Sequence, residues 1–401
     1  MPLSTCRMRW LDLSAAACIL ASAAVAGAQM TEAQPATTTT SGAVSRVYVS
    51  FTPSGASANK VAGFAVSPNG SLTTIGGSPF VANVDSIVLN GKYFFGSTTS
   101  GKYVASFRIQ STGALKWVNS TDVQAPDATG CVYPGVLNLD HSGAMLYRVQ
   151  FSGGLCDHTH YQSFTIDNTT GKLHFLGKSA DSFLFNFPLT ITANNAYAYG
   201  SECLNYQGNP LDTFAGYVRQ SSGLLNLASV SAPDPATQNS NDFYCRAWTA
   251  ADPYNHVAVT FTDTNFNDPY SSPATQLGVY TVQSGGNLTT TSTWSNMPST
   301  AVGSVAGLAM SPDGKLLAVF GSGGLQVFHF NGASSITHFT GLLTSAAIVG
   351  ARWDRAHHLF AVSQSAGKLF VYTVTTTSAT GASGSPRAIS SPAALVVQPL
   401  N

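Results

Sequence analysis

Charged residues are scarce in this chain of 401 residues: Lys, Arg, Asp and Glu together make up 9%, and the formal net charge is zero. No basic cluster appears, so the sequence lacks the electrostatic footprint that nucleic-acid binding needs. Long apolar runs are lacking too, because the N-terminal stretch from Leu11 to Val25 is too short and too rich in Ala for a membrane span. The sequence therefore predicts neither a nucleic-acid partner nor a membrane span.

The N-terminus has the pattern of a secretory signal peptide. Arg7 and Arg9 precede the apolar stretch, and Ala26-Gly27-Ala28 offers a cleavage site. We expect an exported protein, periplasmic or extracellular, that is a monomer. The predicted parts are a signal peptide (1–28), a disordered Thr-rich tether (29–45) and one domain (46–401).

Only six cysteines occur, and Cys6 and Cys18 leave with the signal peptide. In an oxidising compartment the other four favour two disulfides. The order of the segments predicts the pairs Cys131–Cys156 and Cys203–Cys245. The alternative is that these four are buried free thiols.

A strand-turn-strand repeat dominates the rest of the sequence. In "GLAMSPDGKLLAVFGSGGLQVFHFNG" (Gly307–Gly332), apolar strand positions are separated by the turn Ser311–Gly314 and by a second Gly-containing break. A looser fourth strand follows at 336–343. Four antiparallel strands over about 43 residues are typical of one propeller blade.

The same order occurs in six complete units, and a seventh is split between the two ends of the chain. The second to fourth strands of a blade are matched by the first segments of the domain, "RVYVSF" and "VAGFAVSPNGSLTTI". The missing first strand is matched by the last residues of the chain, "AALVVQPLN". Pairing the ends would close the ring and remove its open edges. The sequence predicts an all-β, seven-bladed β-propeller of four-stranded blades.

With these units the chain resembles the lactonase family of seven-bladed propellers, which includes 6-phosphogluconolactonase-like proteins and merges into the YVTN repeat proteins. The resemblance covers residues 46–401 and rests on turn and strand residues. It implies lactone hydrolysis. Where family members often place a His at the start of an inner strand, this chain has Gly135, and His141 falls in the following turn. The family's catalytic residues are therefore not carried over.

Binding residues are expected in the long connections, because long loops on a rigid scaffold commonly carry function. All four mature cysteines map to the same face as these connections. By contrast, His357 and His358 fall in a short turn on the opposite face and are expected to be solvated. The expected long loops are 119–133, 153–161, 202–214, 229–244 and 262–276.

The densest polar cluster is "CDHTHYQ", in which alternation along an extended segment would place His158 and His160 on one side. With Asp157 they can bind a divalent cation or act as a general base. The third interpretation is a set of polar loop residues with no ligand. No other cofactor is expected.

Two arginines are predicted to lie on inner strands. Arg246 and Arg352 can bind the oxygens of a carboxylate or a lactone, or can pair with a carboxylate of a neighbouring blade. The nearest acids by topology are Glu202 and Asp242, and Tyr244 lies beside them.

Three functions remain open. The main prediction is binding of a small molecule, glycan or protein partner on the long-loop face, which the low charge and the missing catalytic His favour. The alternative is a lactonase-like hydrolase with its site at the mouth of the channel. The third is a surface-layer or adhesion component.

Overall fold

The computed structural model describes residues 42–400, apart from the segments 124–134, 153–157, 184–188, 207–208, 239–241 and 266–273. The predicted signal peptide and all but the end of the predicted tether lie outside the described residues. Within these ranges, no helix has the length and apolar character to cross a membrane.

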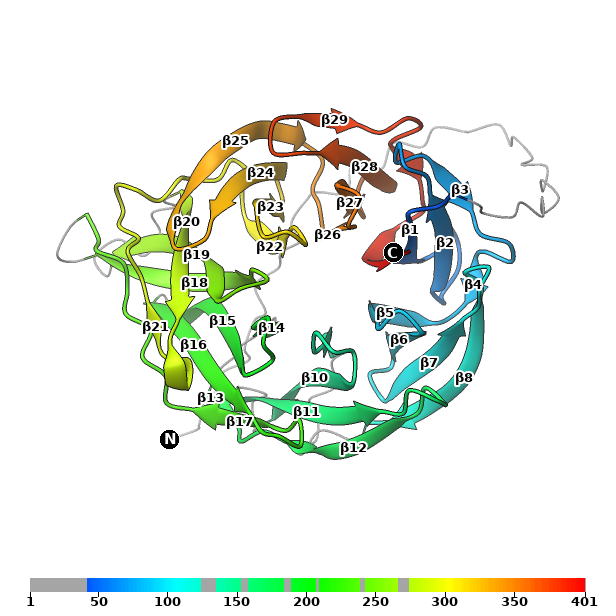
Figure 1. Cartoon of the computed structure of the whole chain (residues 1–401), viewed down its shortest axis with the longest axis horizontal. Helices are drawn as coiled ribbons and strands as arrows, with labels where there is room; N and C mark the ends of the chain where they lie inside the picture. The colour runs from blue at the N-terminus through cyan, green and yellow to red at the C-terminus, as the bar shows by residue number, and fades with distance from the viewer. Residues whose placement is uncertain are drawn as a thin grey trace, which may run out of the picture. The chain divides into compact units, whose positions relative to one another are not determined.

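Seven antiparallel sheets form the domain, and each is one blade of a propeller (Figure 1). We label the blades A to G in chain order and give the strands of each from the innermost outward. Blade A contains β31 (Pro392–Pro399), β1 (Ser45–Phe51), β2 (Lys60–Val66) and β3 (Leu72–Thr74), with β4 (Phe80–Val81) also on β2. Blade B contains β5 (Val84–Leu89), β6 (Tyr93–Thr98), β7 (Tyr103–Ile109) and β8 (Leu115–Asp122). Blade C contains β9 (Leu137–Leu139), β10 (Met145–Ser152), β11 (His158–Ile166) and β12 (Leu173–Lys178), with β13 (Ser182–Phe183) also on β11.

The remaining four blades repeat this order. Blade D contains β14 (Leu189–Ile191), β15 (Tyr197–Tyr206), β16 (Asn209–Arg219) and β17 (Leu225–Ala228). Blade E contains β18 (Asp242–Ala251), β19 (His256–Asn265), β20 (Thr275–Val282), the short 3-10 helix η1 (Ser284–Gly286) and β21 (Leu288–Thr289). Blade F contains β22 (Val305–Met310), β23 (Leu316–Gly321), β24 (Gly324–Asn331) and β25 (Ser334–Thr344). Blade G contains β26 (Gly350–Trp353), β27 (His358–Ser363), β28 (Lys368–Val374) and β29 (Ala379–Gly381), with β30 (Arg387–Ala388) also on β28.

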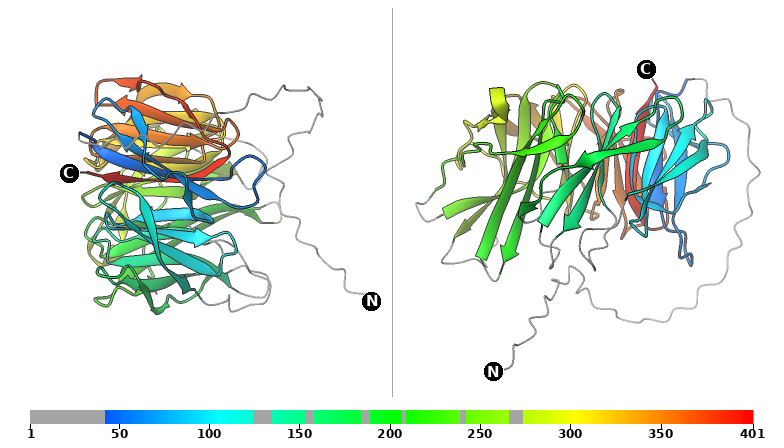
Figure 2. Two further views of the ribbon diagram at one scale, coloured as in Figure 1. Left: turned by 90° about the vertical axis from the view of Figure 1, so that its right-hand side faces the viewer. Right: turned by 90° about the horizontal axis from the view of Figure 1, so that it is seen from below.

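The two ends of the domain meet in blade A, where β31 pairs antiparallel with β1. Val47 lies opposite Val397 and Val49 lies opposite Leu395 in this ladder. The predicted seven-bladed ring and its closure by the C-terminal strand are therefore confirmed, and Figure 2 shows the ring from the side.

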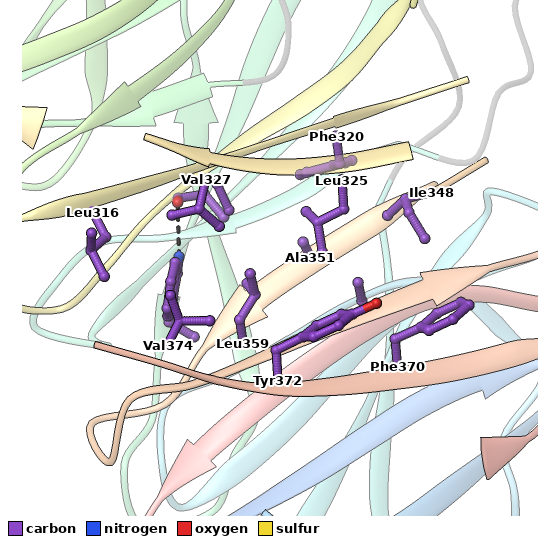
Figure 3. Packing of buried hydrophobic residues seen from close by; sticks show 14 residues of the cluster. Leu316, Phe320, Leu325, Val327, Ile348, Ala351, Leu359, Phe370, Tyr372 and Val374 are labelled. Carbon is purple, nitrogen blue, oxygen red and sulfur yellow. Dashed lines mark hydrogen bonds between the residues drawn. The ribbon is translucent and has the colours of Figure 1, made fainter. Parts of the chain in front are cut away.

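Apolar side chains between neighbouring sheets make up the core. Figure 3 shows one such layer, between blades F and G, in which Phe320 and Val327 of blade F lie against Ala351, Leu359 and Val374 of blade G. All of these residues are buried. Because successive residues of a strand point to opposite faces, both faces of each blade can be covered by the next blade in the ring.

The turns between first and second strands keep the polar residues that the sequence predicts there. In blade F the hydroxyl of Ser311 accepts a 2.9 Å hydrogen bond from the N–H of Leu316, and Gly314 has φ of 68°. In blade G the carboxylate of Asp354 accepts the N–H of His358 at 2.8 Å. These short turns fix the register of the inner strand against the second one.

One predicted long loop is instead a strand pair. The backbone of 202–214, apart from 207–208, continues the ladder of β15 and β16 until Tyr206 lies opposite Asn209. Pairing satisfies backbone N–H and C=O groups that a loop would leave to water. Likewise β11 begins at His158, inside the predicted loop 153–161, and Cys245 lies within β18.

Hydrogen bonds also join the inner part of one blade to the next. They fix the positions of the inner strands around the ring, and with them the wall of the central channel. The pairs are Ser50 Oγ to the Asp85 carbonyl (3.1 Å), the Leu137 N–H to Ser86 Oγ (3.0 Å), Thr190 Oγ1 to the Thr249 carbonyl (2.9 Å), Trp248 Nε1 to the Val305 carbonyl (2.8 Å), Trp353 Nε1 to the Ala309 carbonyl (2.9 Å) and Ser45 Oγ to Asp354 Oδ2 (2.7 Å).

Candidate functional site in the central channel

A cavity of about 800 Å³ occupies the centre of the ring, and the first strands of all seven blades line it. This volume lies within the range of small-molecule sites. The lining residues are Asp85, Ser86, Ile87, Val136, Leu137, Asn138, Leu189, Thr190, Trp248, Thr249, Ala250, Ala251, Ala306, Gly307, Leu308, Ala309, Met310, Pro312, Phe320, Val349, Gly350, Arg352, Trp353, Ala393, Ala394 and Leu395.

Only two of these lining residues carry a charge, the acid Asp85 and the base Arg352. Asp85 lies on β5 and Arg352 on β26, and β31 lies between these strands in contact with both. A carboxylate and a guanidinium thus line the same largely apolar cavity, and each interacts with a ligand more strongly there than in bulk water.

Asp85 occupies a bulge in β5. Asp85 and Ser86 together lie opposite a single residue of β6, since Val84 pairs with Thr98 and Ile87 with Gly96. Such bulges re-aim a side chain and are frequent beside active sites. Asp85 itself is among the residues that line the channel.

The carboxylate of Asp85 is held by the neighbouring blade. Asn59 precedes β2 of blade A and donates through Nδ2 to Asp85 Oδ1 at 2.5 Å and to the Val84 carbonyl at 3.1 Å. Burial raises the pKa of Asp85, and the hydrogen bond from Asn59 opposes that rise. Asp85 Oδ2 has no hydrogen bond to any described residue, so one oxygen remains available to a ligand or to water.

Asn138 contributes an unsatisfied donor to the same wall. It lies on β9, in contact with β5, and its Nδ2 is buried without a hydrogen-bond partner in the described part of the chain. A buried amide N–H without a partner costs free energy. Nδ2 itself is closed to the channel as the side chain lies, so a ligand oxygen can accept from it only after the Asn138 side chain turns toward the channel.

Trp248 lies on a second bulge, in β18, where Ala247 and Trp248 face one residue of β19. Its indole N–H donates to the Val305 carbonyl, so only the apolar part of the ring can contact a ligand in the channel. The indole presents a flat surface against which a ligand can pack.

Among the predicted site residues whose side chains the structure describes, Arg352 is the one that lines the channel. Its guanidinium donates through Nη1 to the carbonyl of Ala351 at 2.8 Å, and no described carboxylate pairs with it. The side chain is accessible through the channel but enclosed by the protein around it, and this desolvation lowers the pKa of Arg352. The guanidinium stays protonated at neutral pH and can bind an oxyanion.

The predicted histidine cluster lies elsewhere. His158 and His160 are on β11, the third strand of blade C, and neither lines the channel. His160 is buried, with Nδ1 at 3.0 Å from Oδ1 of the partly exposed Asp181. Asp157 lies outside the described residues. Within the described ranges, no group of three or more His, Cys, Asp or Glu side chains is arranged to hold a metal ion.

The guanidinium of Arg246 makes its contacts with other residues of the protein. Its Nη1 donates to the Ala232 carbonyl at 2.9 Å, its Nε lies 3.8 Å from Oδ1 of Asp234, and the guanidinium stacks over the ring of Phe214 at 4.7 Å. Tyr244 is fully buried, with its ring 5.5 Å from that of Phe261.

The predicted acids and cysteines are described only in part. Glu202 lies on β15 and Asp242 on β18, but their side chains are outside the described part, as is that of Cys203. Cys131 and Cys156 lie in segments outside the described residues. Cys245 is buried and disulfide-bonded. The two predicted pairings stay predictions.

The prediction for the turn histidines is half wrong. His357 is exposed as expected, but His358 is completely buried, with Nδ1 2.8 Å from Oδ2 of Asp354 and Nε2 3.2 Å from the Pro68 carbonyl. It is enclosed because the turn of blade G packs against blade A, a contact between distant parts of the sequence.

Comparison with solved structures identifies similar propellers. One is a periplasmic gluconolactonase from Pseudomonas aeruginosa, with a TM-score of 0.57 and 14% identity over 88% of this chain and 98% of that one. Another is a protein from Lactobacillus plantarum, with a TM-score of 0.56 and 12% identity over 88% and 99%. A third is a putative 6-phosphogluconolactonase from Bacteroides uniformis, with a TM-score of 0.54 and 12% identity over 88% and 99%.

The likeness is one of fold. The predicted resemblance to lactonase-type propellers is confirmed at that level, and identities this low carry no residue roles. No family model and no curated sequence matches the chain.

Sequence reasoning missed Asp85, Asn59 and Asn138. Asp85 could have been found, since it is one of only 18 acidic residues and it lies near the start of the inner strand β5. Asn59 and Asn138 gave no such signal, because Asn is frequent in the turns of this chain.

Proposed function

We propose that this propeller hydrolyses a small lactone inside its central channel. The observation that carries the proposal is the lining of the channel. Among the described residues it holds one carboxylate with an oxygen that makes no hydrogen bond, one guanidinium and, buried in its wall, one amide N–H without a partner, in an otherwise largely apolar space. The lactonase-type neighbours support it at the level of the fold.

Each polar group has a role in this chemistry. Asp85 takes a proton from a water molecule through Oδ2, and the resulting hydroxide attacks the lactone carbonyl carbon. The carbonyl oxygen becomes an oxyanion, which accepts the Nδ2–H of Asn138 once that side chain has turned toward the channel. The bond between that carbon and the ring oxygen then breaks, and the ring oxygen takes the proton back from Asp85. The product is a hydroxy acid. Arg352 binds a carboxylate group of the ligand.

The environment of Asp85 suits this role. A general base works best when its pKa lies near the working pH, and burial moves the pKa of Asp85 upward in that direction. The bonds from Asn59 fix the carboxylate, so little reorganisation is needed when the proton is transferred.

The test is turnover of a lactone panel by the purified protein beside Asp85→Asn and Asn138→Ala. We expect Asp85→Asn to lower kcat about a hundredfold or more. Asp181→Asn, which removes an acid outside the channel, is the matched control. A fully active Asp85→Asn enzyme, or no turnover of any lactone by the folded protein, would reject the proposal.

A second candidate is binding of a small molecule without turnover. It is favoured by Gly135, where an added Cβ would lie 2.5 Å from the Val149 carbonyl and 2.7 Å from Nε of Arg148. The position at which lactonase-type propellers often carry His has no room for a side chain here. Ligand binding that persists in a protein with no hydrolysis would support this candidate.

We further propose that the protein is exported and oxidised. Support comes from the predicted signal sequence, from the disulfide at Cys245 and from the fact that one similar structure is of a periplasmic protein. Cell fractionation and N-terminal sequencing test this, with Gln29 as the expected first residue. The disulfide pairs Cys131–Cys156 and Cys203–Cys245 belong to the same proposal, and peptide mapping without reduction tests them.

A further inference from the structure

The walls of the channel carry information about the ligand beyond the reacting group. Among its lining residues, the apolar ones that keep some exposure are Val136, Trp248, Ala251, Ala306, Met310, Val349, Ala393 and Ala394. Val349 is the most open of them, with 41% of its surface exposed. Apolar surface that is left open in a cavity favours an apolar ligand.

The polar groups are too few for a polyhydroxylated ligand. Thr190 and Thr249 bond to each other and to the backbone, and the indole N–H of Trp248 is used by Val305. Ser86 accepts the N–H of Leu137. A sugar with a hydroxyl on nearly every carbon would lose its bonds to water in this space without replacing them.

The charges also exclude a phosphorylated ligand. A phosphate dianion is bound by several charged or backbone donors, and here Arg352 is the one cation among the lining residues. Asp85 in the same channel would repel a second negative charge. One guanidinium matches one carboxylate, because its two parallel N–H groups fit the two oxygens.

We propose that the channel takes a lactone with an apolar body that carries a single carboxylate, which Arg352 binds, while the body packs on Trp248, Met310 and Val349. This inference rests on the proposed function for the reaction and goes beyond it in the class of substrate.

The experiment measures hydrolysis and binding separately. The hydrolysis series consists of paraconic acid (a γ-lactone with one carboxylate), its derivatives with alkyl chains of increasing length, glucono-δ-lactone and the 6-phosphate of that lactone. We expect kcat/KM to rise by up to about fourfold for each methylene that the apolar wall covers. The gluconolactones should be turned over far more slowly. Calorimetry with the corresponding lactams, which keep the ring and the same number of carboxylates but are hydrolysed far more slowly, gives binding without reaction.

Variants of Arg352 test the carboxylate contact. Arg352→Met keeps the length of the side chain and should weaken binding of the carboxylated ligands about ten- to a hundredfold, with little change for alkyl lactones that lack the carboxylate. Arg352→Lys should recover part of the loss. Arg355→Met removes the same charge from the exposed turn three residues away and is the control.

The outcomes separate this inference from the proposed function. If gluconolactones are hydrolysed faster than the alkyl series, the substrate class is wrong and lactone hydrolysis stands. If no lactone is hydrolysed but the carboxylated alkyl lactams bind and gluconolactam does not, hydrolysis is wrong and the ligand class stands. Equal binding of all ligands, or binding unaffected by Arg352→Met, overturns the inference.

Discussion

The side-chain amide of Asn59 donates a 2.5 Å hydrogen bond to Oδ1 of Asp85, and the two residues belong to neighbouring blades. Asn59 is itself buried and fixed, because its Oδ1 accepts the hydroxyl of Thr52 at 2.7 Å and its N–H donates to Asn83 at 2.9 Å. The position of the one acid in the channel is thus set by a connection between two strands of another blade.

Asn59→Ala removes a hydrogen bond that lowers the pKa of Asp85, so this pKa should rise further. Because the base acts in its ionised form, the acid limb of the kcat/KM profile should move to higher pH, and activity lost at acidic pH should return as the pH increases. Other charges near Asp85 do not obscure this: β9 and β31 carry no ionisable side chain, Arg46 of β1 bonds to Gln398 and the Ser111 carbonyl, and no described charged group pairs with Asp85.

NMR titration of the Asp85 carboxyl in the free protein measures the same shift without any substrate. Asn331→Ala, which removes a matched amide from the exposed end of β24, is the control. An unchanged titration in Asn59→Ala would show that the contact has no influence on the carboxylate.

Ring closure should carry much of the stability. Leu395 of β31 is buried between blades A and G, so Leu395→Ala leaves a cavity and should lower the free energy of unfolding by about 2 to 5 kcal/mol. Leu342→Ala, at a site with 42% exposure, should cost less than about 1 kcal/mol. Urea unfolding compares the two, and equal costs would mean that the closing strand is not part of the cooperative core.

Much of this architecture could be predicted from the sequence, because a blade is a local pattern. The turn Ser311–Gly314 and the flanking alternation indicate three strands directly, and β31 was identified as the missing strand by comparison with the other blades. The candidate site could not be predicted in the same way. Asp85 and Asn138 meet in the channel only because seven distant strands surround one axis, and spacing along the chain does not reveal that.

The error at His358 has the same origin. Its neighbour His357 is exposed, and only the packing of blade G on blade A buries the second ring. Likewise Arg246 and Arg352 looked alike as inner-strand arginines. The structure separates them. The guanidinium of Arg246 contacts the ring of Phe214 and the Ala232 carbonyl, whereas Arg352 lines the channel.

The buried pair of Asp354 and His358 should make stability depend on pH. Burial alone would raise the pKa of Asp354, but hydrogen bonds from His358 and Ser45 outweigh it, and the pKa is lowered. A carboxyl whose folded pKa is depressed stabilises the protein above its unfolded pKa, and this contribution is lost as the pH falls through the folded value.

Asp354→Asn should therefore cost about 3 to 5 kcal/mol at neutral pH, and its difference from the wild type should shrink in acid. Denaturant unfolding over a pH series measures this. Asp313→Asn changes a carboxylate in the corresponding turn of blade F, where its partner is a serine, and is the control. A constant difference across the series would contradict the assignment.

A tyrosine hydroxyl joins blades C and D in a way that can be tested on its own. Tyr147 is fully buried, donates to the Gly223 carbonyl at 2.8 Å and accepts from Nε of Arg219 at 3.1 Å. Burial raises the pKa of Tyr147, so the hydroxyl remains a donor throughout the neutral range.

Tyr147→Phe leaves a carbonyl and a guanidinium N–H without this partner and should cost about 1 to 3 kcal/mol. Tyr254→Phe, on a side chain that is 67% exposed, should change stability by less than about 0.5 kcal/mol. Similar midpoints for the two variants in urea would show that the buried hydroxyl does not help to hold blades C and D together.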